Sequence, residues 1–158
     1  HYEINQLSFN FRLSDINCAL GVSQIKKLEK IIIKRNQLFK IYVKKLMDLK
    51  KYIHIPNLLK KFSAHHLMLI SIKKFNYKKK NNLIKFLNKN GIFPQFHYIP
   101  LYRHKAVKSK IDGIYKNNGA EKYRSTFLSL PLFYELNISS IDKVVNLLKK
   151  YFTKYEKK

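Results

Sequence analysis

The chain has 158 residues and a formal net charge of +24, because 33 basic residues outnumber nine acidic ones. Its hydrophobic fraction of 46% and aromatic fraction of 14% are enough for a folded core, which excludes a disordered tail. No apolar run reaches the roughly 18 residues of a membrane span, and a single cysteine excludes a disulfide framework and a multi-cysteine zinc site. We expect one soluble or peripheral α/β unit in a reducing compartment, the cytoplasm.

Two explanations are open for the positive charge. Of the 33 basic residues, 29 are lysine and four are arginine. Lysine, isoleucine and asparagine are abundant here and share A/T-rich codons, so genome composition is one explanation. The other is a basic surface for an anionic partner. A nucleic-acid reader is typically richer in arginine, whose guanidinium pairs with phosphate and guanine through two hydrogen bonds.

The chain opens on His1 with no signal-peptide pattern, so we expect a piece of a longer protein. After an irregular lead-in over residues 1–13, Ser14 and Asp15 predict the start of a helix. Apolar residues at helical spacing then predict one long helix ending near Leu49, or two pieces bent near Gly21. We expect this apolar stripe to pack in the core. It consists of Ile16, Leu20, Ile25, Leu28, Ile32, Phe39, Val43 and Leu46.

The middle of the chain predicts a strand–helix–strand unit over residues 66–97, after a short strand at 52–56. The first strand is the apolar run 66–72, and the helix follows the lysine cluster 78–80. Asn90 and Gly91 end that helix. The second strand, 92–97, contains a proline, so it lies at a sheet edge or starts after the proline.

The last third predicts mostly helix. Residues 98–118 form a long irregular stretch of the kind that is often functional. A short helix is expected over 119–127, then a turn over 129–132. Asn137 is expected to cap a final amphipathic helix.

Two segments contain candidate binding residues. Asn10 and Arg12 stand just before a helix start, where backbone N–H groups favour a phosphate, although both side chains equally fit a role in the turn. The second segment, Phe96–His104, is rich in polar aromatic side chains and follows a strand, where α/β folds bind ligands. Its alternative is an aromatic loop packed on the body.

Other kinds of site are not expected. The neighbours His65 and His66 would face opposite sides of a strand, so they cannot hold one metal ion, and we predict no metal site. Nine acidic residues offer no convincing carboxylate pair for hydrolysis, and four glycines cannot form a nucleotide-binding loop.

Four segments in collinear order resemble the DegT/StrS sugar aminotransferases, which use pyridoxal phosphate. They are the run FNFRLSDINCALG from residue 9, SAHHL from Ser63 with His65 at the usual tryptophan, FHYIPLY from Phe96 after Asn90–Gly91–Ile92, and LSLPL from Leu128 after Gly119–Lys122. Each motif alone is weak, but four in order over nearly the whole chain are specific. Cys18 and the HYIPLY form are most similar to a branch that aminates a UDP-linked sugar on the way to pseudaminic acid.

The resemblance implies the C-terminal portion of a fold type I aminotransferase. Residues 1–50 would be the end of the large cofactor-binding domain and a connecting long helix, and residues 51–158 a small C-terminal α/β domain. The lysine that binds the cofactor covalently lies upstream in the family. No catalytic residue is therefore expected in this chain, and the chain is expected to be inactive alone.

The resemblance also implies roles for single residues. Asn10 would reach the cofactor phosphate of the neighbouring subunit in a homodimer, with Arg12 beside it. His97, Tyr98 and Tyr102 would line the sugar pocket. The implied reaction transfers an amino group from glutamate to the C4 keto group of a nucleotide-linked sugar, with the cofactor as electron sink.

A rival interpretation is a small basic nucleic-acid-binding module. The charge and interleaved aromatics such as Phe75–Lys78 favour it. The low arginine count and the absence of RRM, KH and helix-turn-helix signatures oppose it. A third possibility is the inactive product of a split or decayed gene, against which the intact motifs argue.

Overall fold

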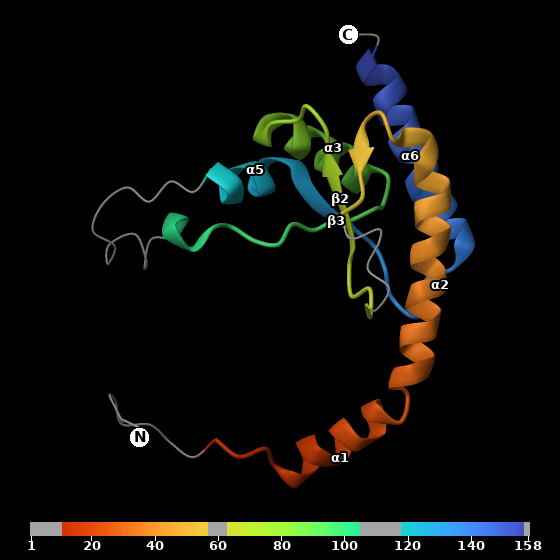
Figure 1. Cartoon of the computed structure of the whole chain (residues 1–158), viewed down its shortest axis with the longest axis vertical. Helices are drawn as coiled ribbons and strands as arrows, with labels where there is room; N and C mark the ends of the chain where they lie inside the picture. The colour runs from red at the N-terminus through yellow and green to blue at the C-terminus, as the bar shows by residue number, and fades with distance from the viewer. Residues whose placement is uncertain (1–10, 57–62, 105–117, 157–158) are drawn as a thin grey trace.

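The computed structural model describes residues 11–56, 63–104 and 118–156, which form an α/β arrangement around a small sheet (Figure 1). The helices are α1 (Asp15–Ile25), α2 (Leu28–Leu46), α3 (Tyr77–Lys89), α5 (Asn118–Thr126) and α6 (Ile138–Glu156). Two 3-10 turns are η1 (Met47–Leu49) and η2 (Leu101–Arg103), and the strands are β1 (Ile53–His54), β2 (Met68–Ile72) and β3 (Phe127–Leu130). No helix among the described residues is both long and apolar enough to cross a membrane.

The sheet has the order β1–β2–β3, and both neighbours of β2 run antiparallel to it. Because side chains alternate along a strand, Met68, Ile70 and Ile72 share one face of β2, and all three are buried. Ile70 lies opposite Leu128 of β3. The apolar run in the sequence is therefore the central strand of the sheet.

The core lies between the sheet and two long helices, α2 and α6, which run side by side (Figure 1). Tyr42 of α2 is fully buried, and its hydroxyl donates to the Pro131 carbonyl at 3.0 Å. Burial raises the pKa of Tyr42 above its usual value. Phe152 of α6 is also fully buried and stacks on Tyr52 with ring centroids 4.7 Å apart. These contacts join α2 to the segment after β3, and α6 to the residue that precedes β1.

Local capping signals in the sequence are confirmed. The Ser14 hydroxyl accepts from the Asn17 backbone N–H at 3.4 Å at the start of α1, and the Asn137 side chain accepts from Ser140 at 2.8 Å before α6. Gly91 ends α3 with a φ of 77°, a left-handed conformation that favours glycine. Asn76 caps α3 through the Lys79 N–H at 2.9 Å. The lysine cluster 78–80 thus lies inside α3, not before it.

The first helical region differs from its prediction in two ways. The break lies at Lys26–Lys27, between α1 and α2, and not near Gly21. The apolar stripe is core only in its later part, since Leu46 is buried whereas Ile16 is 82% exposed and Ile25 71%. Figure 1 shows α1 projecting from the lower end of α2, away from the sheet. The prediction of core packing is wrong for α1 because nothing else in the described chain covers it.

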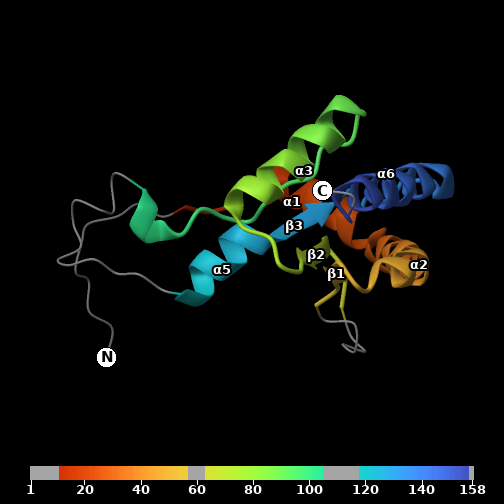
Figure 2. The same ribbon diagram turned by 90° about the horizontal axis from the view of Figure 1, so that it is seen from above.

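The strand prediction was also wrong in two places. Residues 92–97 form no strand, and only Gln95 makes an isolated antiparallel bridge to Ser129. Pro94 lacks the N–H that a ladder needs, so pairing begins after it. The expected turn over 129–132 begins inside β3, whose Leu128 and Leu130 are buried against β2. In Figure 2, β3 runs below α3 and points toward the near end of α6.

Candidate functional site

The segment before α1 is an exposed arm. Every residue from 11 to 22 is exposed, including Arg12, and α1 itself buries no residue. The Ser14 hydroxyl already satisfies one N–H of the helix start. Asp15 places a carboxylate in the first turn, so the positive charge for a phosphate comes from Arg12. Asn10, the other predicted phosphate ligand, lies outside the described residues.

This arm lies apart from the second predicted segment. Figure 1 shows the arm standing apart from the loop that carries His97, so the structure does not bring the two predicted segments together within one chain. An exposed guanidinium next to a helix start is a suitable anion contact once a second surface covers it.

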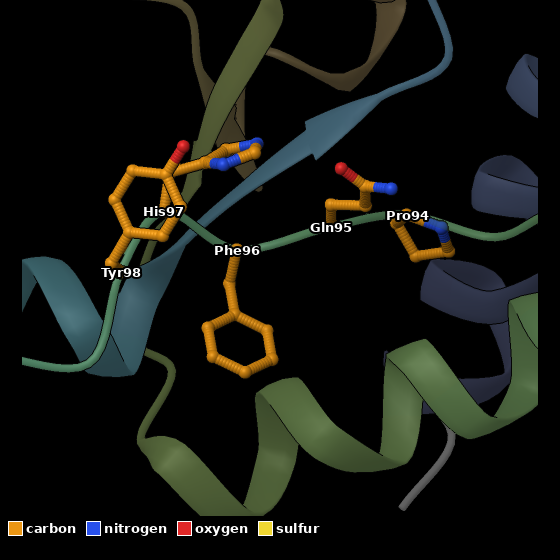
Figure 3. A pocket seen from close by; sticks show the side chains of 5 residues that line it. All are labelled: Pro94, Gln95, Phe96, His97 and Tyr98. Atoms are coloured by element: carbon orange, nitrogen blue, oxygen red, sulfur yellow. The ribbon is translucent and has the colours of Figure 1, made fainter. Parts of the chain in front are cut away.

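The second segment forms a hollow of about 350 Å³ lined by Pro94 and Gln95 together with Phe96, His97 and Tyr98 (Figure 3). Gln95 fixes it to β3, because its backbone exchanges two hydrogen bonds with Ser129, at 3.1 and 2.7 Å. The His97 Nε2 atom lies 2.9 Å from the Ser129 hydroxyl. The aromatic segment is therefore anchored to β3, at one edge of the sheet.

His97 and Tyr98, which were both predicted to contact the sugar, both line the hollow. Their rings meet edge to face with centroids 4.9 Å apart, and Tyr98 is 77% exposed. The buried Nδ1 atom of His97 has no hydrogen-bond partner among the described residues. A buried ring nitrogen without a partner is costly to the folded state.

Tyr102 is held elsewhere. Its hydroxyl donates to Glu121 Oε1 at 2.9 Å, and the Arg103 Nε donates to the same oxygen at 2.6 Å. The Arg103 hydrogen bond lowers the pKa of Glu121, with a smaller contribution from Tyr102. Tyr102 does not line the hollow beside His97, so its predicted contact with the sugar requires a ligand or a subunit that extends toward α5.

Lys80 is a feature that sequence reasoning missed. It is 0% exposed, and its ammonium donates to the Arg124 carbonyl and, at 3.3 Å, to the Phe127 carbonyl. The same Nζ lies 5.1 Å from the centre of the Phe96 ring. Burial lowers the pKa of Lys80 to about 8, and the positive charge of Arg124 adds to the shift. Lys80 thus joins α3, α5 and the floor of the hollow.

A signal for Lys80 was present in the sequence. Lys80, Leu83 and Leu87 are spaced three and four residues apart, so they share one face of α3, and all three are buried. A lysine is almost never fully buried unless its ammonium is paired, so the residue type alone argues against a buried position. Its partners are backbone carbonyls and aromatic rings, which no local motif reveals.

His65, at the usual position of a tryptophan, also has a defined place. Its ring stacks on Phe39 with centroids 3.7 Å apart and planes 15° apart. Burial lowers the pKa of His65, which favours the neutral ring in this stack. The packing expected at this position is therefore provided by an imidazole. Within the described ranges, no group of three or more His, Cys, Asp or Glu side chains is placed to hold a metal ion.

Comparison with known proteins settles the family. Residues 1–149 match the model of the DegT/DnrJ/EryC1/StrS aminotransferase family. The chain belongs to this family. The match extends over the exposed arm and the aromatic hollow alike, and it leaves the nucleic-acid-binding interpretation without support.

Two named transaminases match this chain over almost its whole length. The UDP-4-amino-4,6-dideoxy-N-acetyl-beta-L-altrosamine transaminase of Helicobacter pylori is 29% identical over 154 residues, which are 98% of this chain and 41% of that protein. The enzyme of the same name from Campylobacter jejuni serotype O:2 is 32% identical over 152 residues, 96% of this chain and 40% of that protein. The chain thus spans about two fifths of the length of these relatives.

Solved structures of family members have the same fold. Helicobacter pylori PseC, described as an aminotransferase involved in the biosynthesis of pseudoaminic acid, superposes with a TM-score of 0.82 at 30% identity, over 96% of this chain and 41% of that one. A putative sugar aminotransferase of Streptococcus pneumoniae in its PMP form gives a TM-score of 0.82 at 22% identity, over 95% of this chain and 38% of its own. The predicted fold, the C-terminal portion of a pyridoxal-phosphate aminotransferase, is confirmed.

Proposed function

We propose that the chain is the C-terminal part of a pyridoxal-phosphate-dependent aminotransferase that moves an amino group from glutamate to the C4 keto group of a UDP-linked sugar. The product would serve nonulosonic acid or surface polysaccharide synthesis in the cytoplasm. The observation that carries this proposal is the match to the two named transaminases over at least 96% of the chain. The single free cysteine, Cys18, fits a reducing compartment.

In this proposal the arm acts across a homodimer. Pyridoxal phosphate supplies the electron sink of amino transfer when bound, and the protein orients it. Asn10 and Arg12 would bind its phosphate in the neighbouring subunit. The exposure of Arg12 and of the apolar side chains of α1 supports this role, because such a surface is covered in an assembled enzyme.

The hollow would receive the sugar. Tyr98 would pack against the sugar ring, and the His97 ring would lie beside it in the lining of the hollow. Ser129 holds the Nε2 atom of His97, which fixes the direction of the ring. Tyr102 would contact the sugar nucleotide from the side of α5. None of these residues carries the covalent chemistry, so the chain alone is proposed to be inactive.

A chimera tests the proposal. The matched part of the Helicobacter pylori transaminase is replaced by this chain, and amino transfer from glutamate to a UDP-linked 4-keto sugar is measured together with the absorbance of bound cofactor. We expect the chimera to bind cofactor and to transfer the amino group, while the 158-residue chain alone does neither. A folded chimera that retains cofactor but aminates no nucleotide sugar contradicts the proposal, as does activity of the isolated chain.

Arg12→Ala in the chimera tests the arm. Loss of a charge-assisted contact to phosphate is expected to weaken cofactor retention about tenfold, measured by equilibrium dialysis. Lys44→Ala removes another exposed positive charge, from α2, and serves as the matched control. Equal losses in the two variants would mean that general charge, and not the arm, attracts the phosphate.

Ser129→Ala in the chimera tests the hollow. Without the Ser129 hydroxyl the His97 ring is free to turn, so we expect KM for the sugar nucleotide to rise several-fold with little change in kcat. KM for glutamate is the internal control, since the hollow is proposed to bind only the sugar. A fall in kcat with both KM values unchanged contradicts this role.

A further inference from the structure

A second concave surface lies between α3 and α6, which are adjacent in the fold (Figure 2). This groove has a volume of about 700 Å³, within the range of roughly 300–1,000 Å³ that ligand sites occupy. None of its lining residues is shared with the hollow at Pro94–Tyr98. The buried face of α3, formed by Lys80, Leu83 and Leu87, turns toward the core, so the groove occupies another flank of the helix.

The groove is strongly positive. Four of its eight lining residues are lysines, namely Lys78 and Lys79 of α3 and Lys150 and Lys154 of α6, and none is acidic. Lysine makes up 29 of 158 residues in the chain, so composition alone does not account for lysine being half of this lining. The N-terminus of α3 adds its partial positive charge at the same end. Ammonium groups from two helices favour an anion with more than one charge.

The wall of the groove is aromatic. Phe86 and Tyr151 contact each other with ring centroids 5.3 Å apart and planes tilted by 50°, and both are half-buried. The exposed part of either ring offers an apolar face on which a planar ring packs. Asn82 is exposed on the same lining, and its amide carries both a donor and an acceptor for the edge of a heterocycle.

We propose that the groove between α3 and α6 binds a nucleoside diphosphate, with its phosphates among the four lysines and its base against Phe86 and Tyr151. Inorganic phosphate would use only the lysines, and an uncharged nucleoside only the rings. A ligand that combines both parts uses the whole lining. This site is additional to the sugar-binding hollow and does not depend on the reaction proposed above.

The test is a titration of the ¹⁵N-labelled 158-residue chain with ADP, followed by NMR. We expect shifts concentrated at Asn82, Phe86 and Tyr151, and weaker binding of both pyrophosphate and adenosine than of ADP. Lys150→Glu with Lys154→Glu is expected to weaken ADP binding by about tenfold or more.

Lys85→Glu with Lys143→Glu is the matched control, because it makes the same charge change at exposed positions of α3 and α6, the two helices that form the groove, but outside its lining. We expect this pair to leave the dissociation constant within about twofold. Circular dichroism checks that both double variants are folded. If Lys150→Glu with Lys154→Glu unfolds, Lys150→Gln with Lys154→Gln is used in its place.

Three results would overturn the proposal. They are an equal loss of ADP binding in the two double variants, pyrophosphate binding as tightly as ADP, and shifts at Pro94–Tyr98 in place of the groove. Amino transfer is not measured in this experiment. The groove and the proposed aminotransferase function can therefore fail independently.

Discussion

Replacing Phe152 with alanine is expected to lower the free energy of unfolding by about 3–5 kcal/mol. The side chain is 0% exposed and meets three other aromatic rings, those of Tyr52, Phe75 and Tyr151. Removing it leaves a cavity between α6 and the segments that carry Tyr52 and Phe75, and the rigid rings around it cannot collapse to fill the space. The loss is a large part of the roughly 5–15 kcal/mol that stabilises a typical domain.

Urea denaturation followed by circular dichroism measures this effect. Phe93→Ala is the control, because the same chemical change is made at a side chain that is 68% exposed, and we expect it to cost less than about 0.5 kcal/mol. Similar losses at Phe93 and Phe152 would show that α6 does not pack on the sheet as described. A lower slope of unfolding against urea would point to a less compact native state.

The second large effect is a dependence of stability on pH that originates at Lys80. The buried lysine has a pKa of about 8, lowered from an ordinary value of 10.5 by loss of solvent and by Arg124. Between these values the native protein has released the proton while the unfolded chain still holds it. The unfolded state then binds more protons, so stability rises as pH increases from about 8 to 10.5, by at most about 1.4 kcal/mol per pH unit.

Lys80→Met keeps most of the side-chain volume and removes the titrating group. We expect the free energy of unfolding of the native sequence, relative to this variant, to increase from pH 8 to pH 10, as measured by urea denaturation at each pH. Tyr42 has the opposite effect above pH 10, because burial raises its pKa and the unfolded chain ionises first, but this contribution is common to both proteins. Lys85→Met, at an exposed position of α3, should show no such difference. A constant gap between Lys80→Met and the native sequence would mean that Lys80 does not titrate in this range.

Local signals in the sequence were sufficient to predict that the helices form, although not the position of the break between α1 and α2. Ser14 and Asn137 were recognised as caps because a capping hydrogen bond involves residues only three positions apart. β3 was missed because Phe127–Leu130 becomes a strand through pairing with β2, far away in the sequence. The periodic stripe on α1 was recognised correctly as a helix face. Its burial could not be read from periodicity, which says which face is apolar and not what covers it.

In the candidate site too, features set by neighbouring residues could be predicted from the sequence, and features set by tertiary contacts could not. His97 and Tyr98 are adjacent in sequence, so their common location needed no knowledge of the fold, and the structure adds the Ser129 contact that orients the histidine. Tyr102 is only a few residues further on, yet η2 and Glu121 direct its hydroxyl toward α5. Lys80 was missed entirely, since its pairing with the carbonyls of Arg124 and Phe127 depends on tertiary structure.

The burial of Lys80 also makes it a built-in chemical reporter. Amine-reactive reagents modify exposed lysines freely, and the chain offers 29 lysines in all. Lys80 is the one buried lysine within the described ranges, so a reagent reaches it only when α3 separates from α5. The rate of labelling at Lys80, measured by mass spectrometry, would therefore report how often α3 separates from α5. A ligand that closes the nearby hollow would slow this labelling.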